Sequence, residues 1–472
     1  MEAIEVESQR TLWSSLVEAV RGSHQDYTAG SLNRAILLLA VPMVLEMVLE
    51  SLFAVVDVFW VGRLGANAVA TVGLTESMLS LVFAVAMGLS LSTTAMVARR
   101  IGEKDPEGAA VAGVQAIALG LIVSVAIGIP CLIFAPRLLQ WMGASAEIVA
   151  VGGGYARICL GGSGAVLLLF LNNAIFRGAG DAAIAMRLLW VSNIINLVLD
   201  PCLIFGWGPF PRLGVAGGAV AVLAYYAVGS VALAMYLWTG RSVVRLSLHG
   251  VRFRWGLFRD ILRVGAVAAL ITVQTNLTIA VATGLVGRFG SAAIAGFGTG
   301  SRLEYLLVPL VFGLGGPLVA MVGTNVGAGQ RGRALRAAWI GAAIAAGLTE
   351  LIGLWAAMVP RVWLSLFDTD PAMLDAGSRY LHVVGPFYGL FGLGMALYFA
   401  SQGAGRLLWP LLANLMRLVI AAGGGWLVLR WTGNVSHVFA ALSAALTVFG
   451  LVNAAAVAGG AWFGRIGWPN NR

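Results

Sequence analysis

Charged side chains are scarce in this chain of 472 residues. Asp, Glu, Lys and Arg make up 11% of the sequence, whereas a soluble domain carries about 25%. Hydrophobic residues make up 59%, and the apolar runs approach the roughly 20 residues that a helix needs to cross a bilayer. We therefore expect an all-α polytopic membrane protein rather than an outer-membrane barrel, which is built from alternating segments of about ten residues.

Residues that serve catalysis or bind metals are also few. The chain has three cysteines, all in or beside apolar runs, and they show neither a disulfide framework nor a metal-binding spacing. Its four histidines are scattered, and we find no His/Asp metal cluster, nucleophile elbow or phosphate-binding loop. We therefore expect no enzymatic activity and no cofactor other than a coupling ion.

The positive charge is distributed in a way that orients the chain in a membrane. The formal net charge is +9, and with the N-terminus inside, 20 of the 30 Lys and Arg residues fall in segments predicted to be cytoplasmic. This asymmetry is what the positive-inside rule predicts for cytoplasmic N- and C-termini. We expect the partner of the basic residues to be the lipid bilayer and not a nucleic acid.

About twelve spans are predicted, in two lobes of six. The predicted helices cover residues 35–62, 67–97, 108–134, 147–171, 183–205, 214–239, 261–287, 292–323, 334–358, 374–400, 409–430 and 436–463. Residues 1–33 are predicted to form a cytoplasmic tail without a signal peptide. The predicted N-lobe (34–239) and C-lobe (261–463) are joined by a cytoplasmic linker (240–260), and a second tail follows (464–472).

The sequence contains an internal repeat. An offset of 225 residues aligns VGRLGANAVATVG (61–73) with VGRFGSAAIAGFG (286–298), identical at seven of thirteen positions. The register holds without a gap, so that GAG at 178–180 aligns with GAG at 403–405. Two copies of six spans have the same orientation, a plan typical of transporters with sites near the repeat interface. A channel or a membrane enzyme can also arise by duplication.

Three carboxylates lie in the first predicted span. At about 100° per residue, Glu46, Glu50 and Asp57 fall on one narrow stripe that extends roughly 16 Å along the helix. An acid at the centre of a membrane helix costs on the order of 3 kcal/mol, so a face with three acids predicts a polar cavity or a partner helix. The alternatives are an interfacial position for Glu50 and a cap or an ion pair with Arg63 for Asp57.

The fifth predicted span offers partners for these acids. Asn193, Asn196 and Asp200 are three and four residues apart and share a helix face. Carboxylate and amide oxygens suit Na⁺, and a carboxyl group shielded from water can carry H⁺ instead. We predict a cation site at Asp57, Asn196 and Asp200, within a polar cavity extended by Glu46, Glu50 and Asn193. Hydrogen bonding between helices is an equally good interpretation of the asparagines.

The second half differs at the acidic positions. The residues that align with Glu46, Glu50, Asp57 and Asp200 are uncharged: Ile271, Thr275, Ala282 and Gly425. This half has a polar set of its own, predicted to form a network of Gln274, Asn276, Arg302 and Glu304. Within it, we expect Arg302 and Glu304 to neutralise each other rather than contact a substrate.

Several motifs together resemble those of the multidrug and toxin extrusion (MATE) family of cation-coupled efflux transporters. They are the proline-then-aspartate spacing of the first span with DVFWVGRLG (57–65), FRGAGD (176–181), NLVLDP (196–201), and SRLE (301–304) with VGTNVGAGQ (322–330). The resemblance covers residues 34–463. It implies twelve helices in two pseudo-symmetric lobes that form a V and open alternately to either side. It also implies export of bulky amphipathic or cationic compounds in exchange for H⁺ or Na⁺.

By their motif positions, Asp57, Asn196 and Asp200 look like the cation-site residues of the prokaryotic DinF-type branch. That branch often adds a threonine from the sixth span, and GVAGGAVAVLAYY (214–226) has none. The seventh-span acid of NorM-type members is also missing from ALITVQTNLTIA (269–280). Glu46 and Glu50 are additional to the pattern.

The sequence therefore predicts a secondary active antiporter for small molecules, acting as a monomer in the cell inner membrane. Replacement of Asp57 or Asp200 by Asn is expected to abolish gradient-driven transport. A flippase for a lipid-linked precursor is the nearest alternative, but such proteins usually carry a basic cavity, and the cavity predicted here is acidic. A channel or a membrane enzyme is a more distant alternative.

Overall fold

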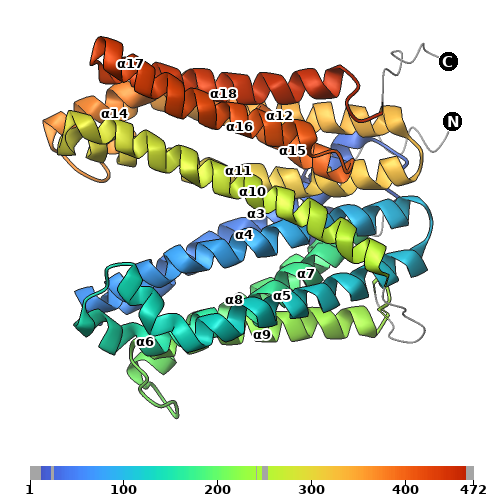
Figure 1. Ribbon diagram of the computed structural model, residues 1–472. Coiled ribbons are helices and arrows are strands. Elements are labelled where there is room, and N and C mark those ends of the chain that lie inside the picture. The colour runs from blue at the N-terminus through green and yellow to red at the C-terminus, as the bar shows by residue number, and fades with distance from the viewer. Residues whose placement is uncertain (1–11, 23–25, 241, 247–253, 464–472) are drawn as a thin grey trace. The chain divides into compact units, whose positions relative to one another are not determined.

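Helices make up all the regular secondary structure that the computed structural model describes, which covers residues 12–22, 26–240, 242–246 and 254–463 (Figure 1). Within these ranges, twelve helical segments are long and apolar enough to cross a membrane. The predicted all-α polytopic fold is confirmed. The predicted tail at 464–472 lies outside the described residues, as do residues 1–11 of the first tail and 247–253 of the linker.

The chain packs into two compact units. The first unit comprises Met1–Gly30 and Leu37–Ala266, and the second comprises Ser31–Ile36 and Val267–Arg472. Their boundary falls inside one long helix, α10 (Trp255–Val286), which begins within the predicted linker. The first turns of α10 therefore belong to the core of the first unit, where Phe258 and Ile261 are buried.

The first unit is built from helices that pack around α4. Its elements before α10 are α2 (Leu12–Arg21), α3 (Leu32–Gly62), α4 (Ala66–Gly102), α5 (Pro106–Trp141), α6 (Ala146–Gly161), α7 (Ser163–Ala179), α8 (Ala182–Phe205) and α9 (Val215–Trp238). Helix α4 contacts α5, α6 and α7, while α9 contacts α6, α7 and α8. The packing of α8 on α9 positions the predicted site, to which α3 contributes Asp57.

The second unit repeats this plan. After α10 and the 3₁₀ turn η2 (Gly287–Phe289) come α11 (Ser291–Gly327), α12 (Arg331–Met358), α13 (Pro360–Leu364), α14 (Pro371–Val384), η3 (Gly385–Phe387), α15 (Tyr388–Gly403), α16 (Leu408–Val419), η4 (Ile420–Gly424), α17 (Gly425–Thr432) and α18 (Val435–Ala458). Helix α11 contacts α12, α14 and α15, and α18 contacts α14, α15 and α16. The same neighbours therefore occur in both units.

Three predicted spans are interrupted helices. Span 147–171 is split between α6 and α7 at Gly162, and span 374–400 is split between α14 and α15 by η3, whose Pro386 has no N–H to donate. Span 409–430 contains η4, a π-helical stretch that includes Gly423 and Gly424. Glycine and proline weaken a regular helix, so the sequence explains where the breaks fall.

Backbone conformation supports the predicted duplication. Among the described residues, four pairs separated by 225 positions share a positive φ: Gly65 with Gly290, Lys104 with Gly329, Gly180 with Gly405, and Gly208 with Gly433. A positive φ is unusual for any residue but glycine. Because each pair lies at a helix end, both halves turn the chain at the same places. Lys104 is the one non-glycine residue of this kind in the described ranges.

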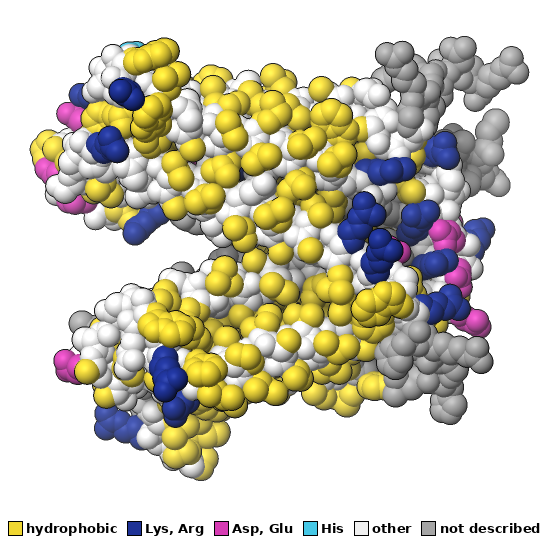
Figure 2. Space-filling model, viewed as in Figure 1, with side chains coloured by type: hydrophobic (Ala, Val, Ile, Leu, Met, Phe, Trp, Pro, Cys, Tyr) yellow, Lys and Arg dark blue, Asp and Glu magenta, His cyan; other side chains and the backbone are white. Residues whose placement is uncertain are grey.

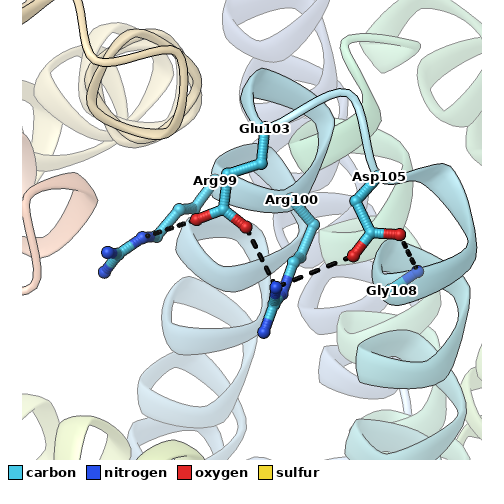
Figure 3. Close-up of polar contacts among 5 residues, drawn as sticks. All are labelled: Arg99, Arg100, Glu103, Asp105 and Gly108. Atoms are coloured by element: carbon cyan, nitrogen blue, oxygen red, sulfur yellow. Dashed lines mark hydrogen bonds and ion pairs between the residues drawn. The ribbon is translucent and has the colours of Figure 1, made fainter.

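Hydrophobic side chains follow the length of the helices, and charged side chains gather at helix ends, as Figure 2 shows. The turn between α4 and α5 is an example (Figure 3). There Glu103 forms ion pairs with Arg99 at 3.2 Å and Arg100 at 3.0 Å, and Asp105 caps α5 by accepting from the Gly108 N–H at 2.8 Å. Polar residues that lie away from helix ends therefore need a separate explanation.

Candidate functional site

The carboxylates predicted to form a cation site meet inside the first unit. Asp57 on α3 and Asp200 on α8 are 5% and 1% exposed. A Cβ built on Gly218 of α9 would lie 3.5 Å from Asp57 Oδ1 and 3.6 Å from Asp200 Oδ1. Both acids therefore point toward the same place beside Gly218, and they interact electrostatically across it.

Close packing of α8 and α9 creates this arrangement. A Cβ on Gly217 would lie only 2.4 Å from the carbonyl oxygen of Leu203, so only glycine allows this approach. The next residue, Gly218, then stands opposite Asp200 without a side chain of its own. The GVAGG stretch that lacks the expected threonine thus has a structural role, because it lets the two carboxylates lie close to the backbone of α9.

Most polar atoms of the site lack hydrogen-bond partners within the described part of the chain. This holds for both carboxylate oxygens of Asp200, for Asp57 Oδ1, and for the amide oxygen and nitrogen of Asn196, which is 1% exposed. Leaving a buried polar group unpaired costs about 1–3 kcal/mol, and more for a charged group. The geometry therefore calls for an occupant that offers positive charge or hydrogen-bond donors to these oxygens.

Apolar side chains surround the acids and keep the local dielectric low. Val61, Ile204 and Ala219 belong to one buried cluster that also contains Tyr155, whose phenol interacts electrostatically with Asp57. Charges act more strongly in such surroundings than in water. A small cation or a proton bound at this site therefore interacts strongly with the two acids.

Glu46 and Glu50 belong to a second polar cluster further along α3. Glu46 is buried and accepts a hydrogen bond from the side-chain amide of Asn173 on α7. Arg177, one turn further along α7 and also buried, interacts electrostatically with both glutamates and donates to Ser90 Oγ at 3.1 Å. This cluster therefore carries a compensating positive charge, which the Asp57–Asp200 site lacks among the described residues.

The cluster contains residues that our sequence prediction did not include. Asn173 and Arg177 are four positions apart in an apolar span, a spacing that indicates a shared helix face. Asn193, which we predicted to extend the cavity, donates to the carbonyl of Leu189 in its own helix at 3.1 Å. Glu50 is half-buried, whereas Glu76 on α4 is exposed.

The prediction that Arg302 and Glu304 neutralise each other is wrong for the described structure. Arg302 is exposed and lies over the ring of Phe367, with its guanidinium carbon 5.4 Å from the ring centroid. Glu304 instead accepts a hydrogen bond from the Tyr380 hydroxyl at 2.6 Å. Residues two apart on a helix point about 200° apart, which explains why these side chains do not meet.

The predicted C-lobe network does not form as one group among the described residues. Gln274 is buried and accepts from Asn414 Nδ2 at 3.2 Å, whereas Asn276 is exposed. Glu350 on α12, to which the sequence assigned no role, accepts from the backbone N–H of Gly389 at 2.7 Å. It therefore serves as an anchor between α12 and α15.

Comparison with known proteins places the chain among transporters. The MatE family profile matches residues 42–202 and 268–427, one match in each half. An FAD transporter from Shewanella oneidensis is 29% identical over 393 residues, which cover 82% of this chain and 86% of that protein. A probable multidrug resistance protein NorM from Deinococcus radiodurans is 28% identical over 448 residues, which cover 92% and 94%.

Solved structures agree with this assignment. A MOP superfamily transporter from Pyrococcus furiosus superposes with a TM-score of 0.83 at 26% identity, over 94% of this chain and 98% of that one. The resemblance predicted from the sequence motifs is confirmed by the family match, which spans more than half of the chain. The chain belongs to the multidrug and toxin extrusion (MATE) family of membrane transporters.

Proposed function

We propose that the protein is a secondary active antiporter that exports bulky amphipathic or cationic compounds in exchange for H⁺ or Na⁺. The observation that carries the proposal is the pair of buried carboxylates at Asp57 and Asp200, of which Asp57 Oδ1 and both oxygens of Asp200 have no hydrogen-bond partner among the described residues. The protein would act as a monomer in the cell inner membrane, with both termini in the cytoplasm.

The proposed mechanism follows from charge burial. A cation bound between Asp57 and Asp200, with Asn196 as a further ligand, relieves the cost of two carboxylates in an apolar cluster. A proton shared between the two carboxyl groups achieves the same neutralisation. Occupancy then favours one arrangement of α3, α8 and α9, and release toward the inside favours the other. Coupling arises because the exported compound and the cation bind the two arrangements with different affinity.

The test is transport by the reconstituted full chain with H⁺ and Na⁺ gradients imposed separately. Asp57→Asn and Asp200→Asn should each reduce gradient-driven export to the level of protein-free liposomes, because neither variant retains both charges. Asp375→Asn is the matched control, since Asp375 is exposed and pairs with Arg361 at 3.4 Å far from any span centre. Undiminished driven export in both site variants refutes the assignment of the coupling site.

The substrate panel should include anionic metabolites as well as cationic dyes. One relative at 29% identity is named an FAD transporter, which supports a metabolite as a second candidate cargo. The acidic character of the first-unit site argues against the alternative of a lipid-linked precursor flippase. Export of a flavin nucleotide but of no cationic dye would assign this chain to metabolite transport.

A further inference from the structure

A separate cavity of about 70 Å³ lies inside the second unit. Helices α10, α11, α14, α15, α16 and α18 all contribute to its walls. Most of the lining is apolar, including Phe297, Val308 and Leu446, but Arg417 and Glu304 also reach it. One water needs about 10–15 Å³ of such space, so the cavity can hold a small polar group together with part of an apolar body.

Arg417 is a buried cation without a hydrogen-bonding partner in the described structure. Its side chain is 5% exposed, and its guanidinium lies over the rings of Phe391 and Phe449, with centroids 5.5 Å and 5.6 Å away. Among the described residues it makes no hydrogen bond or ion pair. Aromatic rings cover the faces of a guanidinium and leave the N–H groups at its edge free to donate.

The backbone beside Arg417 is irregular. Helix α16 ends at Val419, two residues after Arg417, and the π-helical stretch η4 follows at once. Ala421 of this stretch lines the cavity. A π-helical turn is uncommon and is frequent at functional sites, because it widens the helix and changes the direction of nearby side chains.

The negative group of the cavity already has a partner. Glu304 accepts from the Tyr380 hydroxyl at 2.6 Å, and the hydroxyls of Tyr380 and Tyr388 lie 3.3 Å apart. Both tyrosines are almost completely buried. Glu304 therefore belongs to a hydrogen-bonded chain and also interacts electrostatically with Arg417, whereas the N–H groups of Arg417 have no hydrogen-bond acceptor among the described residues. The unmet need in this cavity is for an acceptor.

We propose that this cavity is a binding subsite for the carboxylate of an aromatic or aliphatic organic acid, with Arg417 as the residue that binds it. A planar guanidinium edge matches a carboxylate in a bidentate geometry. Because Glu304 already adds one negative charge to the cavity, a singly charged carboxylate is favoured over a doubly charged phosphate. The apolar walls then contact the body of the acid. That this acid is cargo, and not a bound regulator, rests on the proposed function.

The experiment measures binding of radiolabelled benzoate to the full chain in nanodiscs by equilibrium dialysis, with benzamide as the uncharged probe of the same shape. The wild type should prefer benzoate by about tenfold or more. Arg417→Gln should reduce benzoate binding to that of benzamide. Arg430→Gln is the matched control, because Arg430 lies in the same span and over the Trp426 ring at 5.5 Å but is exposed.

A second variant tests the proposal even if Arg417→Gln does not fold. Glu304→Gln removes the competing negative charge while keeping an acceptor for Tyr380, so benzoate binding should become several times tighter. A merely structural role for Arg417 predicts no such gain. No preference for benzoate in the wild type, or no tightening in Glu304→Gln, overturns the proposal, and the cavity then holds water only.

The result of the benzoate-binding experiment does not depend on the proposed coupling site at Asp57 and Asp200. Benzoate binding needs no gradient, so Asp57→Asn should leave it unchanged while abolishing driven export. Benzoate binding that depends on Arg417, together with export that does not depend on Asp57, would refute the proposed coupling site alone. The reverse result would refute the carboxylate subsite alone.

Discussion

The two halves share their turns and their helix contacts but differ in the charge of their interiors. Asp57 and Asn196 define the site in the first unit, and the residues 225 positions later, Ala282 and Ala421, line the cavity of the second. The Asp57–Asp200 site and the cavity of the second unit therefore lie at corresponding places in the fold. In the first, two acids lack partners, and in the second, one arginine does. The duplicated framework was kept, while the two acids of the first unit contrast with one arginine and one glutamate in the second.

The partner helices differ in the same way. Arg417 takes the position of Ser192, and Ser443 takes the position of Gly218. Ser443 Oγ donates to the carbonyl of Val383 at 2.9 Å, so a side chain occupies this place in the second unit. In the first unit, Gly218 has no side chain at this place and lies beside two carboxylates. Filling or emptying matched positions is therefore a direct way to test what each half does.

The largest expected effect comes from filling the space beside Gly218. Gly218→Leu places a branched side chain between Asp57 and Asp200 and should abolish gradient-driven export in proteoliposomes. Gly218→Ala should keep most of it, because the added Cβ makes only ordinary contacts at 3.5 Å and 3.6 Å. Full export by Gly218→Leu would show that the space between the acids is not needed for coupling.

A smaller effect, shared by both halves, is expected at two glycines where helices touch. A Cβ on Gly178 would lie 2.8 Å from the Thr94 carbonyl oxygen, and one on Gly403 would lie 2.5 Å from that of Val319. Gly178→Ala and Gly403→Ala should each cost about 1–3 kcal/mol of stability, with Gly403→Ala the worse of the two. Thermal unfolding in detergent measures this.

The control for the paired glycines is Gly154→Ala, since no atom lies within 4 Å of its added Cβ. This substitution should leave the unfolding temperature unchanged or raise it slightly, because alanine favours a helix. If all three variants unfold at the same temperature, the matched close contacts are not what holds α7 on α4 and α15 on α11.

Buried hydrogen bonds that involve α7 in the first unit and α15 in the second should contribute differently to stability. Asn173→Leu leaves the buried Glu46 without its donor and should cost about 1–3 kcal/mol. In the second unit, Tyr398 takes the position of Asn173 and Gln402 takes that of Arg177. Gln402 donates to the Tyr398 hydroxyl at 2.8 Å, and Gln402→Leu should cost about 1 kcal/mol because that acceptor is neutral. Equal losses in the two unfolding curves would contradict a charged Glu46.

The smallest effect is expected at the turn between α4 and α5. Lys104 has a φ of 58°, and its counterpart Gly329 has a φ of 73°. Lys104→Gly should stabilise the protein by less than about 1 kcal/mol, because relief of strain is partly offset by the flexibility of glycine in the unfolded chain. Gly329→Lys should destabilise it by a similar amount. A loss of stability in Lys104→Gly would mean that the lysine side chain itself holds the turn.

The sequence predicted the features that depend on spacing within one helix. Hydropathy placed the twelve spans, and the three- and four-residue spacings placed Asp200 and Asn196 on one face. The positions of Gly218 and Arg417 could not be predicted, because both depend on contacts between helices far apart in the chain. Arg302 and Glu304 show the opposite error: two opposite charges close in sequence were paired although helix geometry separates them.

Gly425 limits how the second half could be redesigned as a copy of the first. It takes the position of Asp200, follows η4 directly and is buried. A Cβ added there would lie 2.7 Å from Leu285 Cδ1 on α10, so a side chain at this position points into the packed interior of the second unit. An aspartate engineered at Gly425 would therefore meet an apolar side chain where Asp200 faces a second acid. A symmetrised transporter would first require a smaller residue at Leu285.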